Sequence, residues 1–314
     1  MSEASLVVAA DGGNSKTDLI LATVDGDILA QVRGDGTHAP NNSYDEMAST
    51  LVGLTAQARR EAGVDADAAI ELGVFFCANV DTGYQEQALR DALARYDVCR
   101  ELLIGNDTEA VLHAGAPEGW GIAVVTGAGI NALGCDRAGR TETFLAIGRC
   151  SGDMGGGAWV ATEGQAAAIR DADGRGDGTV LRYMIPEYFG LPDPFEVALA
   201  IDREEITWQQ LLTACPVVYQ AAEAGDEVAL NIIRDQADEV AKMAAALARR
   251  LELDEEVIPV VLGGGVMTHS GKLNQEIVGE ALARRLPEAR PEFLAVPPVR
   301  GSLNYALRHL AAVD

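Results

Sequence analysis

With 314 residues, 48% of them hydrophobic, the chain is long enough for about two domains, each with its own core, at roughly 100 to 200 residues per domain. Its 48 acidic residues outnumber 24 basic ones, and the net charge of −24 argues against nucleic acid or an anionic membrane as a partner, since both would repel it. No basic leader and no run of about 18 apolar residues occur, so we expect neither secretion nor membrane insertion.

The first part of the chain alternates predicted strands and helices. Runs rich in apolar and β-branched residues predict strands at 5–10, 17–24 and 27–33, and Asp25-Gly26 is a hairpin signal between the last two. Apolar periodicity then predicts, in order, a helix near 43–62, a strand at 70–76, a helix near 84–95, a strand near 101–104 and a helix that opens after Asn106.

A similar series begins near Gly119. It consists of an apolar run at 122–127, a turn that contains Gly129, a short strand at 131–136, a turn near Gly139 and a strand at 141–147. Three strands joined by two turns therefore occur twice, about a hundred residues apart, which predicts two similar domains. The remainder is predicted to be mostly helical from 153 to 253, followed by a strand at 258–262, a helix at 272–286 and an amphipathic helix at 301–312.

Five cysteines occur, at positions 77, 99, 135, 150 and 215. Their number is odd and no Cys-x-x-Cys pair is present, so the sequence indicates neither a disulfide framework nor a zinc site. A reducing compartment, the cytoplasm, fits best.

Three glycine-bearing turns follow apolar runs: DGGNSKT at 11–17, TGAGIN at 126–131 and LGGGVM at 262–267. Glycine lets backbone amides approach a ligand with no Cβ in the way, so three such turns could line one polyphosphate. The first is not a P-loop, because the required glycines would fall on Ala10 and Ser15 and because a strand rather than a helix follows it. The pattern suggests a protein that uses ATP.

Five segments resemble those of one family, in its order and spacing. DGGNSKT resembles its first phosphate loop, GNDTEAVLHAG at 105–115 its catalytic-aspartate segment, GWGIAVVTGAGINALG at 119–134 its second phosphate loop, SGDMGGGAWVA at 151–161 its sugar-binding segment, and VVLGGGVM at 260–267 its adenosine segment. The chain thus resembles the superfamily of sugar kinases, actin and heat-shock chaperone ATPases, and within it the N-acetylglucosamine kinase-like group, also called the BadF/BadG/BcrA/BcrD ATPase family.

The resemblance implies an α/β fold of two ribonuclease H-like (actin-like ATPase) lobes with the nucleotide site in the cleft between them. The N-terminal lobe would span 1–116, joined by the C-terminal helix at 300–314, and the second lobe would span 117–299 with a helical insertion. The resemblance also implies a small-molecule sugar as substrate and, as is frequent among such kinases, a homodimer.

Residues of the three turns are candidates for binding ATP and Mg²⁺. Asp11 could hold Mg²⁺ through water, because a hard cation prefers oxygen ligands and keeps several waters beside phosphates. The first turn could offer hydrogen-bond donors and a positive charge to the phosphates, through Gly12, Gly13, Asn14, Ser15 and Lys16. The resemblance adds Thr126, Gly127 and Gly129 as a phosphate clamp and Gly263, Gly264 and Gly265 beside adenosine. Taken as a lone motif, the first turn would be interpreted as a plain β-turn, with Asn and Gly in left-handed conformations.

Asp107 is the candidate general base that takes the proton of the acceptor hydroxyl. It lies where a predicted strand ends and a helix begins, so its carboxylate could face a cleft. The residues alone are equally consistent with Asp107 as a helix N-cap, and the resemblance favours the general base. Asn106 or Thr108 would then cap the helix.

For the acceptor, Asp153 matches the family aspartate that binds sugar hydroxyls, with a helix cap as the alternative. The family more often has Gly-Asp-Glu-Gly-Ser here, whereas this chain has Gly-Asp-Met-Gly-Gly. Asn79 and Asn41 could add contacts to the sugar, although turn formation explains both equally well. We interpret His38 as a loop residue and His113 as a packing residue.

Together these features predict an ATP-dependent kinase that transfers the γ-phosphoryl group to a hydroxyl of an amino sugar, with N-acetylglucosamine as the first choice. The alternative is an ATPase that drives a conformational change in a partner protein, as the dehydratase activators of this family do. Those carry a cluster-ligating cysteine pair across a dimer, and the scattered cysteines here do not resemble it. The sequence leaves open which sugar and hydroxyl react and whether an N-acetyl group is required.

Overall fold

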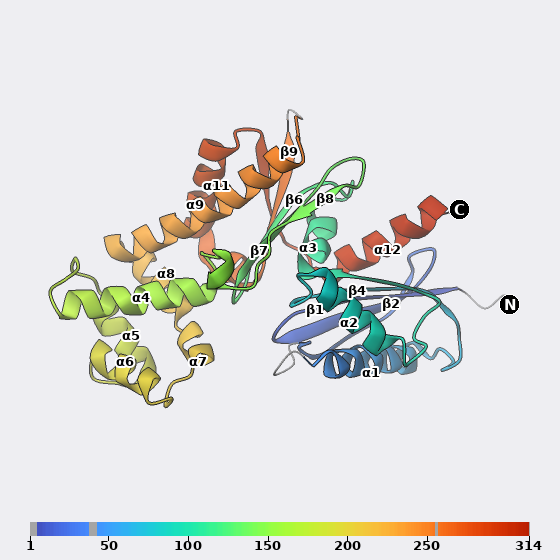
Figure 1. Cartoon of the computed structure of the whole chain (residues 1–314), viewed down its shortest axis with the longest axis horizontal. Coiled ribbons are helices and arrows are strands. Elements are labelled where there is room, and N and C mark those ends of the chain that lie inside the picture. The colour runs from blue at the N-terminus through green and yellow to red at the C-terminus, as the bar shows by residue number, and fades with distance from the viewer. Residues whose placement is uncertain (1–4, 38–42, 255–256, 314) are drawn as a thin grey trace. The chain divides into compact units, whose positions relative to one another are not determined.

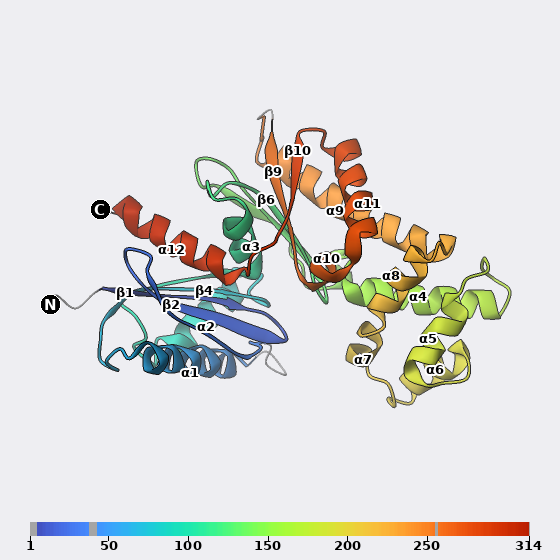
Figure 2. The same cartoon turned by 180° about the vertical axis from the view of Figure 1, so that it is seen from behind.

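The computed structural model describes residues 5–37, 43–254 and 257–313, and it contains two five-stranded sheets flanked by helices (Figure 1). The chain divides into two compact units. Unit 1 comprises Met1–Ala123, Cys135–Arg140 and Leu294–Asp314, and unit 2 comprises Val124–Gly134 and Thr141–Phe293. Figure 2 shows the same elements from behind. That the lobes expected at 1–116 and 117–299 are separate domains stays a prediction.

The sheet of unit 1 has the strand order β3-β2-β1-β4-β5. Its strands are β1 (Leu6–Gly12), β2 (Lys16–Thr23), β3 (Ile28–Asp35), β4 (Ile70–Cys77) and β5 (Glu101–Asn106). β1 pairs antiparallel with β2 and parallel with β4, which pairs parallel with β5. The helices of this unit are α1 (Tyr44–Ala62), α2 (Gly83–Leu93), α3 (Asp107–Gly115) and α12 (Val299–Val313). These bounds confirm the strands and helices predicted for this part of the chain.

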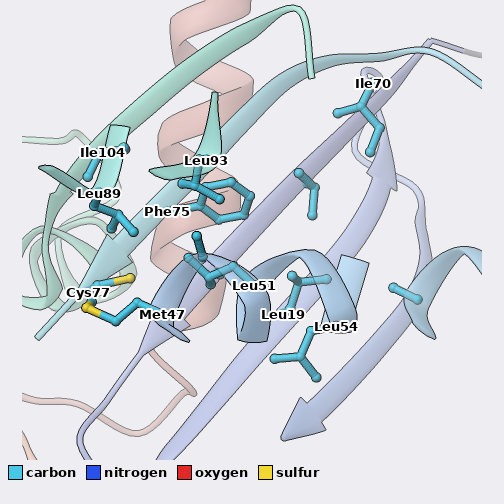
Figure 3. Close-up of a cluster of buried hydrophobic side chains, with 14 of the residues drawn as sticks. Leu19, Met47, Leu51, Leu54, Ile70, Phe75, Cys77, Leu89, Leu93 and Ile104 are labelled. Atoms are coloured by element: carbon cyan, nitrogen blue, oxygen red, sulfur yellow. The ribbon is translucent and has the colours of Figure 1, made fainter. Parts of the chain in front are cut away.

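Alternate residues of the central strands point to opposite faces of this sheet. Leu6, Val8 and Ala10 belong to one buried cluster together with residues of α1 and α2, and Figure 3 shows part of that cluster. Val7 and Ala9 belong to a second cluster, together with residues of α3 and α12. The sheet is therefore covered on both faces, which explains why its central strands are continuous apolar runs in the sequence.

The second sheet has the order β10-β9-β6-β7-β8 and repeats the pattern of the first. Its strands are β6 (Gly121–Thr126), β7 (Ile130–Cys135), β8 (Thr141–Thr143), β9 (Ile258–Gly263) and β10 (Ala289–Phe293). In each sheet, three strands that are consecutive in the chain lie side by side, and two later strands extend the sheet beyond the first of them. This arrangement confirms the duplicated unit predicted from the sequence.

The remainder of unit 2 is helical, as predicted. Its helices are α4 (Gly157–Ala172), α5 (Leu181–Phe189), α6 (Pro194–Asp202), α7 (Trp208–Leu212), α8 (Cys215–Glu223), α9 (Glu227–Arg250), α10 (Gly265–His269) and α11 (Gly271–Arg285). A buried cluster with members from α4, α5, α6, α8 and α9 forms their core. In the part of the chain that the structure describes, no helix combines the length and the apolar character needed to cross a lipid bilayer.

Two parts of unit 2 differ from the prediction. The strand expected at 141–147 ends at Thr143, because the chain turns at Ala146 and Gly148, whose φ angles are 45° and 102°. Strand β10 and helix α10 are not predicted by the sequence pattern. β10 lies at the edge of its sheet and contains Pro291 among charged residues, so it lacks the apolar run of a buried strand.

Helix α12 is fastened to the face of the first sheet that carries α3. Gly301 lies directly against α3, since a Cβ on it would come within 1.9 Å of the Ala110 carbonyl oxygen. The buried Ser302 hydroxyl donates a hydrogen bond of 2.9 Å to the Ala10 carbonyl oxygen in β1. β1 and α3 position the candidate site residues Asp11 and Asp107. By contacting both elements, α12 stabilises them.

His113 in α3 is a packing residue, as predicted. Its ring lies near those of Phe76 and Tyr305, at centroid distances of 6.5 and 4.8 Å. Burial, and then the charge of Arg308, lower the pKa of His113 to about 3, so the ring is neutral at neutral pH. Its Nδ1 can then accept a hydrogen bond from Arg308 at 2.6 Å, which ties α12 to α3.

Replacement of Gly301 by alanine should destabilise the protein, because the added methyl group would overlap the Ala110 carbonyl. We expect Gly301→Ala to lower the free energy of unfolding by about 1 to 3 kcal/mol, the usual cost of overpacking, measured by urea denaturation. Gly279→Ala is the matched control, since Gly279 in α11 has open space beside it and should gain up to ~1 kcal/mol of helix propensity. Equal effects of the two substitutions would contradict the close contact of α12 with α3.

Candidate active site

The first glycine turn is held in place by backbone hydrogen bonds. The Gly12 carbonyl accepts from the Ala78 amide at 2.7 Å, and the Gly13 carbonyl accepts from the Thr37 amide at 3.0 Å. The Gly13 amide donates to the Lys16 carbonyl at 2.9 Å, which closes the turn. A Cβ at Gly12 would lie 2.7 Å from Thr37 Oγ1, so this position has room only for glycine. The β-turn that the residues predict is therefore present, and its neighbours fix it.

The tip of this turn offers unused hydrogen-bond donors. Asn14 and Ser15 are exposed, and within the described part of the chain their backbone amides donate no hydrogen bond. Lys16 Nζ is 3.8 Å from Asp18 Oδ2, and the lysine side chain is largely exposed. The Thr17 hydroxyl is buried and has no partner among the described residues. Free amides, a cation and an unsatisfied hydroxyl are groups that suit phosphate oxygens.

Asp11, the candidate Mg²⁺ ligand, lies at the end of β1 among other carboxylates. It is half-buried and pairs across the sheet with Asp18 of β2. Burial raises its pKa to about 8, with further contributions from the charges of Asp107 and Asp18, while Lys16 opposes the rise. A divalent cation beside Asp11 would relieve this repulsion, so the residues fit Mg²⁺. Among the described residues no group of three or more His, Cys, Asp or Glu could hold a metal, so water and phosphate oxygens would complete its coordination.

Asn106, and not Asp107, caps helix α3. Its Oδ1 accepts hydrogen bonds from the Thr108 amide at 3.0 Å and from the Thr108 hydroxyl at 2.8 Å. Its Nδ2 donates to Asp81 Oδ1 at 2.9 Å, which links the start of α3 to the segment after β4. Asp107 is therefore the first residue of the helix rather than its cap. Of the alternatives that the sequence left open, the structure selects Asn106 as the cap.

Glu109 completes the start of α3 and was missed by the sequence analysis. Its carboxylate accepts a hydrogen bond from the Asn106 amide, in a reciprocal arrangement similar to a capping box. Gly105 makes room for it, since a Cβ there would come within 2.2 Å of Glu109 Oε1. Burial raises the pKa of Glu109 to about 7. The spacing of Asn106 and Glu109 is the sequence signal that could have identified this pair.

The carboxylate of Asp107 lies in an environment that favours its neutral form. Burial, and then the negative charge of Asp81, raise its pKa to about 7, while hydrogen bonds from the backbone amides of Thr108 and of Asp107 itself oppose the rise. The side chain is only half-buried, so solvent or a ligand can reach it. A general base works best with a pKa near the working pH, because it must be ionised and still basic.

In unit 2, the second and third glycine turns lie against each other. Gly264 has a φ of 92°, and a Cβ there would be 2.4 Å from the Thr126 carbonyl oxygen. Gly156, at the start of α4, approaches Gly129 as closely, since a Cβ on it would be 2.5 Å from the Gly129 carbonyl carbon. The structure thus brings together two turns that are far apart in the sequence. It adds Gly156, which the sequence analysis missed although it belongs to a run of three glycines.

Three other glycines of these turns have no neighbour that excludes a side chain. Gly127, Gly129 and Gly265 have open space where a Cβ would be, and Gly263 is the buried last residue of β9. The Thr126 hydroxyl is buried and has no partner among the described residues, as is the case for Thr17 in unit 1. Open backbone beside an unsatisfied hydroxyl fits a polar ligand at this turn.

Asp153 closes a loop and does not cap α4, whose N-cap residue is Gly156. Its Oδ2 accepts hydrogen bonds from the Gly148 amide at 2.7 Å and from the Ser151 hydroxyl at 3.0 Å. Asp153 Oδ1 has no hydrogen-bond partner in the described part of the chain. The hydrogen bonds to Oδ2 therefore fix the orientation of this carboxylate, and Oδ1 is available to bind a ligand.

Asn79 follows β4 in the left-handed conformation, with a φ of 65°, so it does form a turn. Its Nδ2 also donates to Asn14 Oδ1 at 2.7 Å, which places it against the first glycine turn. Asn41 and His38 lie outside the residues that the structure describes.

The chain is similar to known proteins in sequence and in fold. The chain is similar to the N-acetylmuramic acid/N-acetylglucosamine kinase of Clostridium acetobutylicum, with 25% identity over 272 residues that cover 86% of this chain and 88% of that protein. Its fold is similar to that of a provisionally assigned N-acetylglucosamine kinase from Chromobacterium violaceum, with a TM-score of 0.71 and 21% identity over 97% of this chain and 99% of that one. It is also similar to a ROK family glucokinase from Streptomyces griseus in complex with glucose and AMPPNP, with a TM-score of 0.59 and 17% identity over 99% and 100% of the two chains.

A family model matches residues 10–289, a span that includes every candidate site residue from Asp11 to Gly265. The resemblance noted in the sequence is thereby confirmed: the chain belongs to the BadF/BadG/BcrA/BcrD ATPase family.

Proposed function

We propose that this protein is an ATP-dependent kinase that phosphorylates a hydroxyl group of an amino sugar, with N-acetylglucosamine as the first acceptor to test. The observation that carries the proposal is the environment of Asp107. It is the first residue of helix α3, whose cap is Asn106, and burial and the charge of Asp81 raise its pKa to about 7. A half-buried carboxylate of this kind is suited to remove the proton of a sugar hydroxyl.

In the proposed reaction, Asp107 accepts the hydroxyl proton while the hydroxyl oxygen forms a bond to the γ-phosphorus and ADP leaves with the electrons of the broken bond. The free amides of Asn14 and Ser15 and the charge of Lys16 are assigned to phosphate oxygens, whose negative charge they stabilise. Asp11 would hold Mg²⁺, which supplies positive charge to the phosphates when bound.

Unit 2 is assigned the remaining contacts to nucleotide and sugar. The turn formed by Thr126, Gly127 and Gly129 is proposed to contact phosphate, and the segment 263–265 to contact adenosine. Asp153 is proposed to accept hydrogen bonds from sugar hydroxyls through Oδ1, and Asn79 to contribute a further contact.

The choice of an amino sugar as acceptor is supported by relatives. The Clostridium acetobutylicum protein is named for N-acetylmuramic acid and N-acetylglucosamine as substrates. The Streptomyces griseus structure contains AMPPNP, an analogue of ATP, together with a sugar. These names support ATP as the phosphoryl donor and a sugar as the acceptor.

The alternative function is an ATPase that drives a conformational change in a partner protein. The cysteines give it less support than the kinase function has. A metal cluster shared between two subunits needs accessible thiol ligands. Of the five cysteines, all of which are described, Cys77, Cys135 and Cys215 are buried, and only Cys150 is exposed.

ADP release in a screen of hexoses, hexosamines and N-acetylated hexosamines, against a control without sugar, separates the kinase function from the ATPase function. Equal release without sugar would favour the ATPase.

Three further properties are part of the proposal: Mg²⁺ as the metal, a homodimer as the assembly, and the cytoplasm as the location. Dependence of turnover on Mg²⁺ and light scattering of the purified protein test the first two. The location is supported by cysteines that are free rather than paired, since disulfides are rare in reducing compartments.

The Asp107→Asn substitution should abolish most of the activity while the protein still binds ATP. Loss of a general base typically lowers turnover by about 10²- to 10⁴-fold, and asparagine is close in size to aspartate. Coupled ADP release measures turnover, and calorimetry measures ATP binding. Near-normal turnover would reject Asp107 as the base, and lost ATP binding would point to a structural effect.

The Asp81→Asn substitution should move the acidic limb of the pH profile to lower pH. The negative charge of Asp81 contributes to the raised pKa of Asp107, and its removal lowers that pKa, so Asp107 stays ionised in more acidic solution. Asparagine keeps an oxygen that can accept the Asn106 hydrogen bond. The measurement is kcat/KM from about pH 5 to 9. Asp91→Asn on the exposed side of α2 is the control, and a shift toward higher pH would refute the assignment.

The Gly264→Ala substitution should raise KM for ATP. Its methyl group would overlap the Thr126 carbonyl, and its positive φ disfavours alanine. Strain of about 1 to 3 kcal/mol, if it falls on the nucleotide site, corresponds to at least a roughly fivefold rise in KM. Gly178→Ala is the control, because Gly178 has open space beside it. An unchanged KM for ATP in a folded Gly264→Ala variant would argue against this segment as a nucleotide contact.

A further inference from the structure

Three charged residues form a row across neighbouring strands of the first sheet, here called the charged row (Asp11, Asp18 and Arg33). In the antiparallel register, Asp11 of β1 lies opposite Asp18 of β2, and Asp18 lies opposite Arg33 of the edge strand β3. Residues directly opposite each other in a sheet point to the same face, so these side chains are neighbours. The row is beside the first glycine turn, which connects Gly12 to Lys16.

Arg33 neutralises the central carboxylate of this row. Two carboxylates directly opposite each other repel, so Asp11 and Asp18 require a cation nearby. Arg33 Nε donates to Asp18 Oδ1 at 2.7 Å, and Arg33 Nη2 donates to Asp18 Oδ2 at 2.9 Å. Bidentate pairs of this kind are among the strong hydrogen-bonded contacts in proteins. One side chain therefore satisfies both oxygens of Asp18, which is buried.

Lys16 is a second cation near Asp18, and its contact with Asp18 is weak. Lys16 Nζ is 3.8 Å from Asp18 Oδ2, which is beyond hydrogen-bond distance, and the lysine side chain is 57% exposed. An ion pair with so exposed a partner contributes little. In the described part of the chain the Lys16 side chain has no other partner. Because Arg33 satisfies Asp18, the ammonium group of Lys16 remains available to a ligand.

Without Arg33, the same geometry would favour a different ion pair. Asp18 would be a buried carboxylate without its bidentate partner, and an unpaired buried charge is costly. Lys16 is already within ion-pair distance, and a movement of about 1 Å from the present 3.8 Å would bring its Nζ into hydrogen-bond distance of Asp18. Asp18 would then compete with phosphate for the only positive charge of the glycine turn.

We propose that Arg33 is a positioning residue for the nucleotide, because its pairing with Asp18 keeps the ammonium group of Lys16 free to bind the phosphates of ATP. This inference rests on the kinase function proposed above, in which Lys16 binds phosphate. It adds Arg33 and Asp18 to the residues on which that site depends. Arg33 acts through Lys16 and does not itself contact the nucleotide.

The first test is the affinity for ATP, measured by calorimetry with the full chain, in the presence of Mg²⁺ and without sugar. Arg33→Gln should weaken ATP binding by roughly tenfold, as expected when one contact between charged groups is lost. Arg33→Lys should lose less, because lysine still gives Asp18 a cation. Arg100→Gln is the control. Arg100 pairs with both oxygens of Glu71 at 2.9 and 2.8 Å, at the end of the same sheet far from the glycine turn, so ATP affinity should not change.

A second substitution distinguishes the release of Lys16 from a general loss of stability. Arg33→Gln/Asp18→Asn also removes the competing carboxylate, so ATP affinity should return to within about threefold of the wild-type value. Asp35 lies opposite Lys16 across β2 and β3 but is not within ion-pair distance of it. Arg33→Gln/Asp35→Asn should therefore not restore affinity. Loss of affinity in the first double variant, equal to that in Arg33→Gln, would contradict the proposal.

Asp18→Asn keeps the proposal testable if Arg33→Gln does not fold. This single variant leaves Lys16 without a competing carboxylate, so it should bind ATP at least as tightly as the wild type does. Thermal unfolding shows which variants are folded. Weaker ATP binding by a folded Asp18→Asn variant would overturn the inference.

A third comparison tests whether Arg33 acts only through Lys16. Lys16→Gln should weaken ATP binding by itself, and Arg33→Gln should add no further loss in that background, because no ammonium group remains for Asp18 to capture. Additive losses would mean that Arg33 contacts the nucleotide directly, and they would overturn the proposal.

These outcomes separate the inference from the kinase function. Unchanged ATP affinity in a folded Arg33→Gln variant overturns the inference, assigns the pair of Asp18 and Arg33 to sheet stability alone, and leaves the kinase function intact. If the wild type binds ATP but phosphorylates no sugar, the kinase function fails, while the ATP affinities of the variants still decide the role of Arg33. If the wild type does not bind ATP, both proposals fail.

Discussion

The candidate site depends on how the first turn of α3 is satisfied. A helix start leaves backbone amides without partners, and the nearest carboxylate would ordinarily supply them with an acceptor. Here Asn106 takes that role, Glu109 binds the Asn106 amide in return, and Gly105 leaves room for the Glu109 carboxylate. Asp107 is left as the half-buried first residue of the helix, and burial and the charge of Asp81 raise its pKa; partial exposure and a raised pKa are the two properties that general-base chemistry needs. Substitution of Asn106, Glu109 or Gly105 would therefore alter the environment of Asp107 without changing Asp107 itself.

The two sheets show how a repeated scaffold acquires different roles. In each sheet, a glycine turn connects the first two strands, and a buried threonine hydroxyl beside it has no partner among the described residues. The residue before the first glycine of the turn is Asp11 in unit 1 and Thr126 in unit 2. At these turns the charge lies in unit 1, where the charge of Asp107 adds to the raised pKa of Asp11, while the two glycine turns of unit 2 contribute closely packed, uncharged backbone.

Much of the fold could be predicted from the sequence, because buried strands and amphipathic helices leave strong patterns. Edge strand β10 could not, since most of its residues are only half-buried and they carry no such pattern. The site was predictable at the level of its turns and of Asp107. The identity of the α3 cap was not predicted, because Asn106 and Asp107 have similar capping propensity; the local signal was Glu109 three residues after Asn106, and the contact of Asn106 with Asp81 is tertiary. Close approaches such as that of Gly156 to Gly129 depend on tertiary packing, which no local spacing encodes.

The hydrogen bond between Ser302 and Ala10 joins residues that are 292 positions apart. During synthesis on the ribosome, the face of the first sheet formed by Val7, Ala9 and their neighbours can be covered only in part, by α3, until α12 has been made. Nascent chains of this protein should therefore expose apolar strand surface for most of their translation, which is the condition that recruits chaperones and favours aggregation. Because α12 is synthesised after the strands it covers, unit 1 completes its folding late, although those strands are made first.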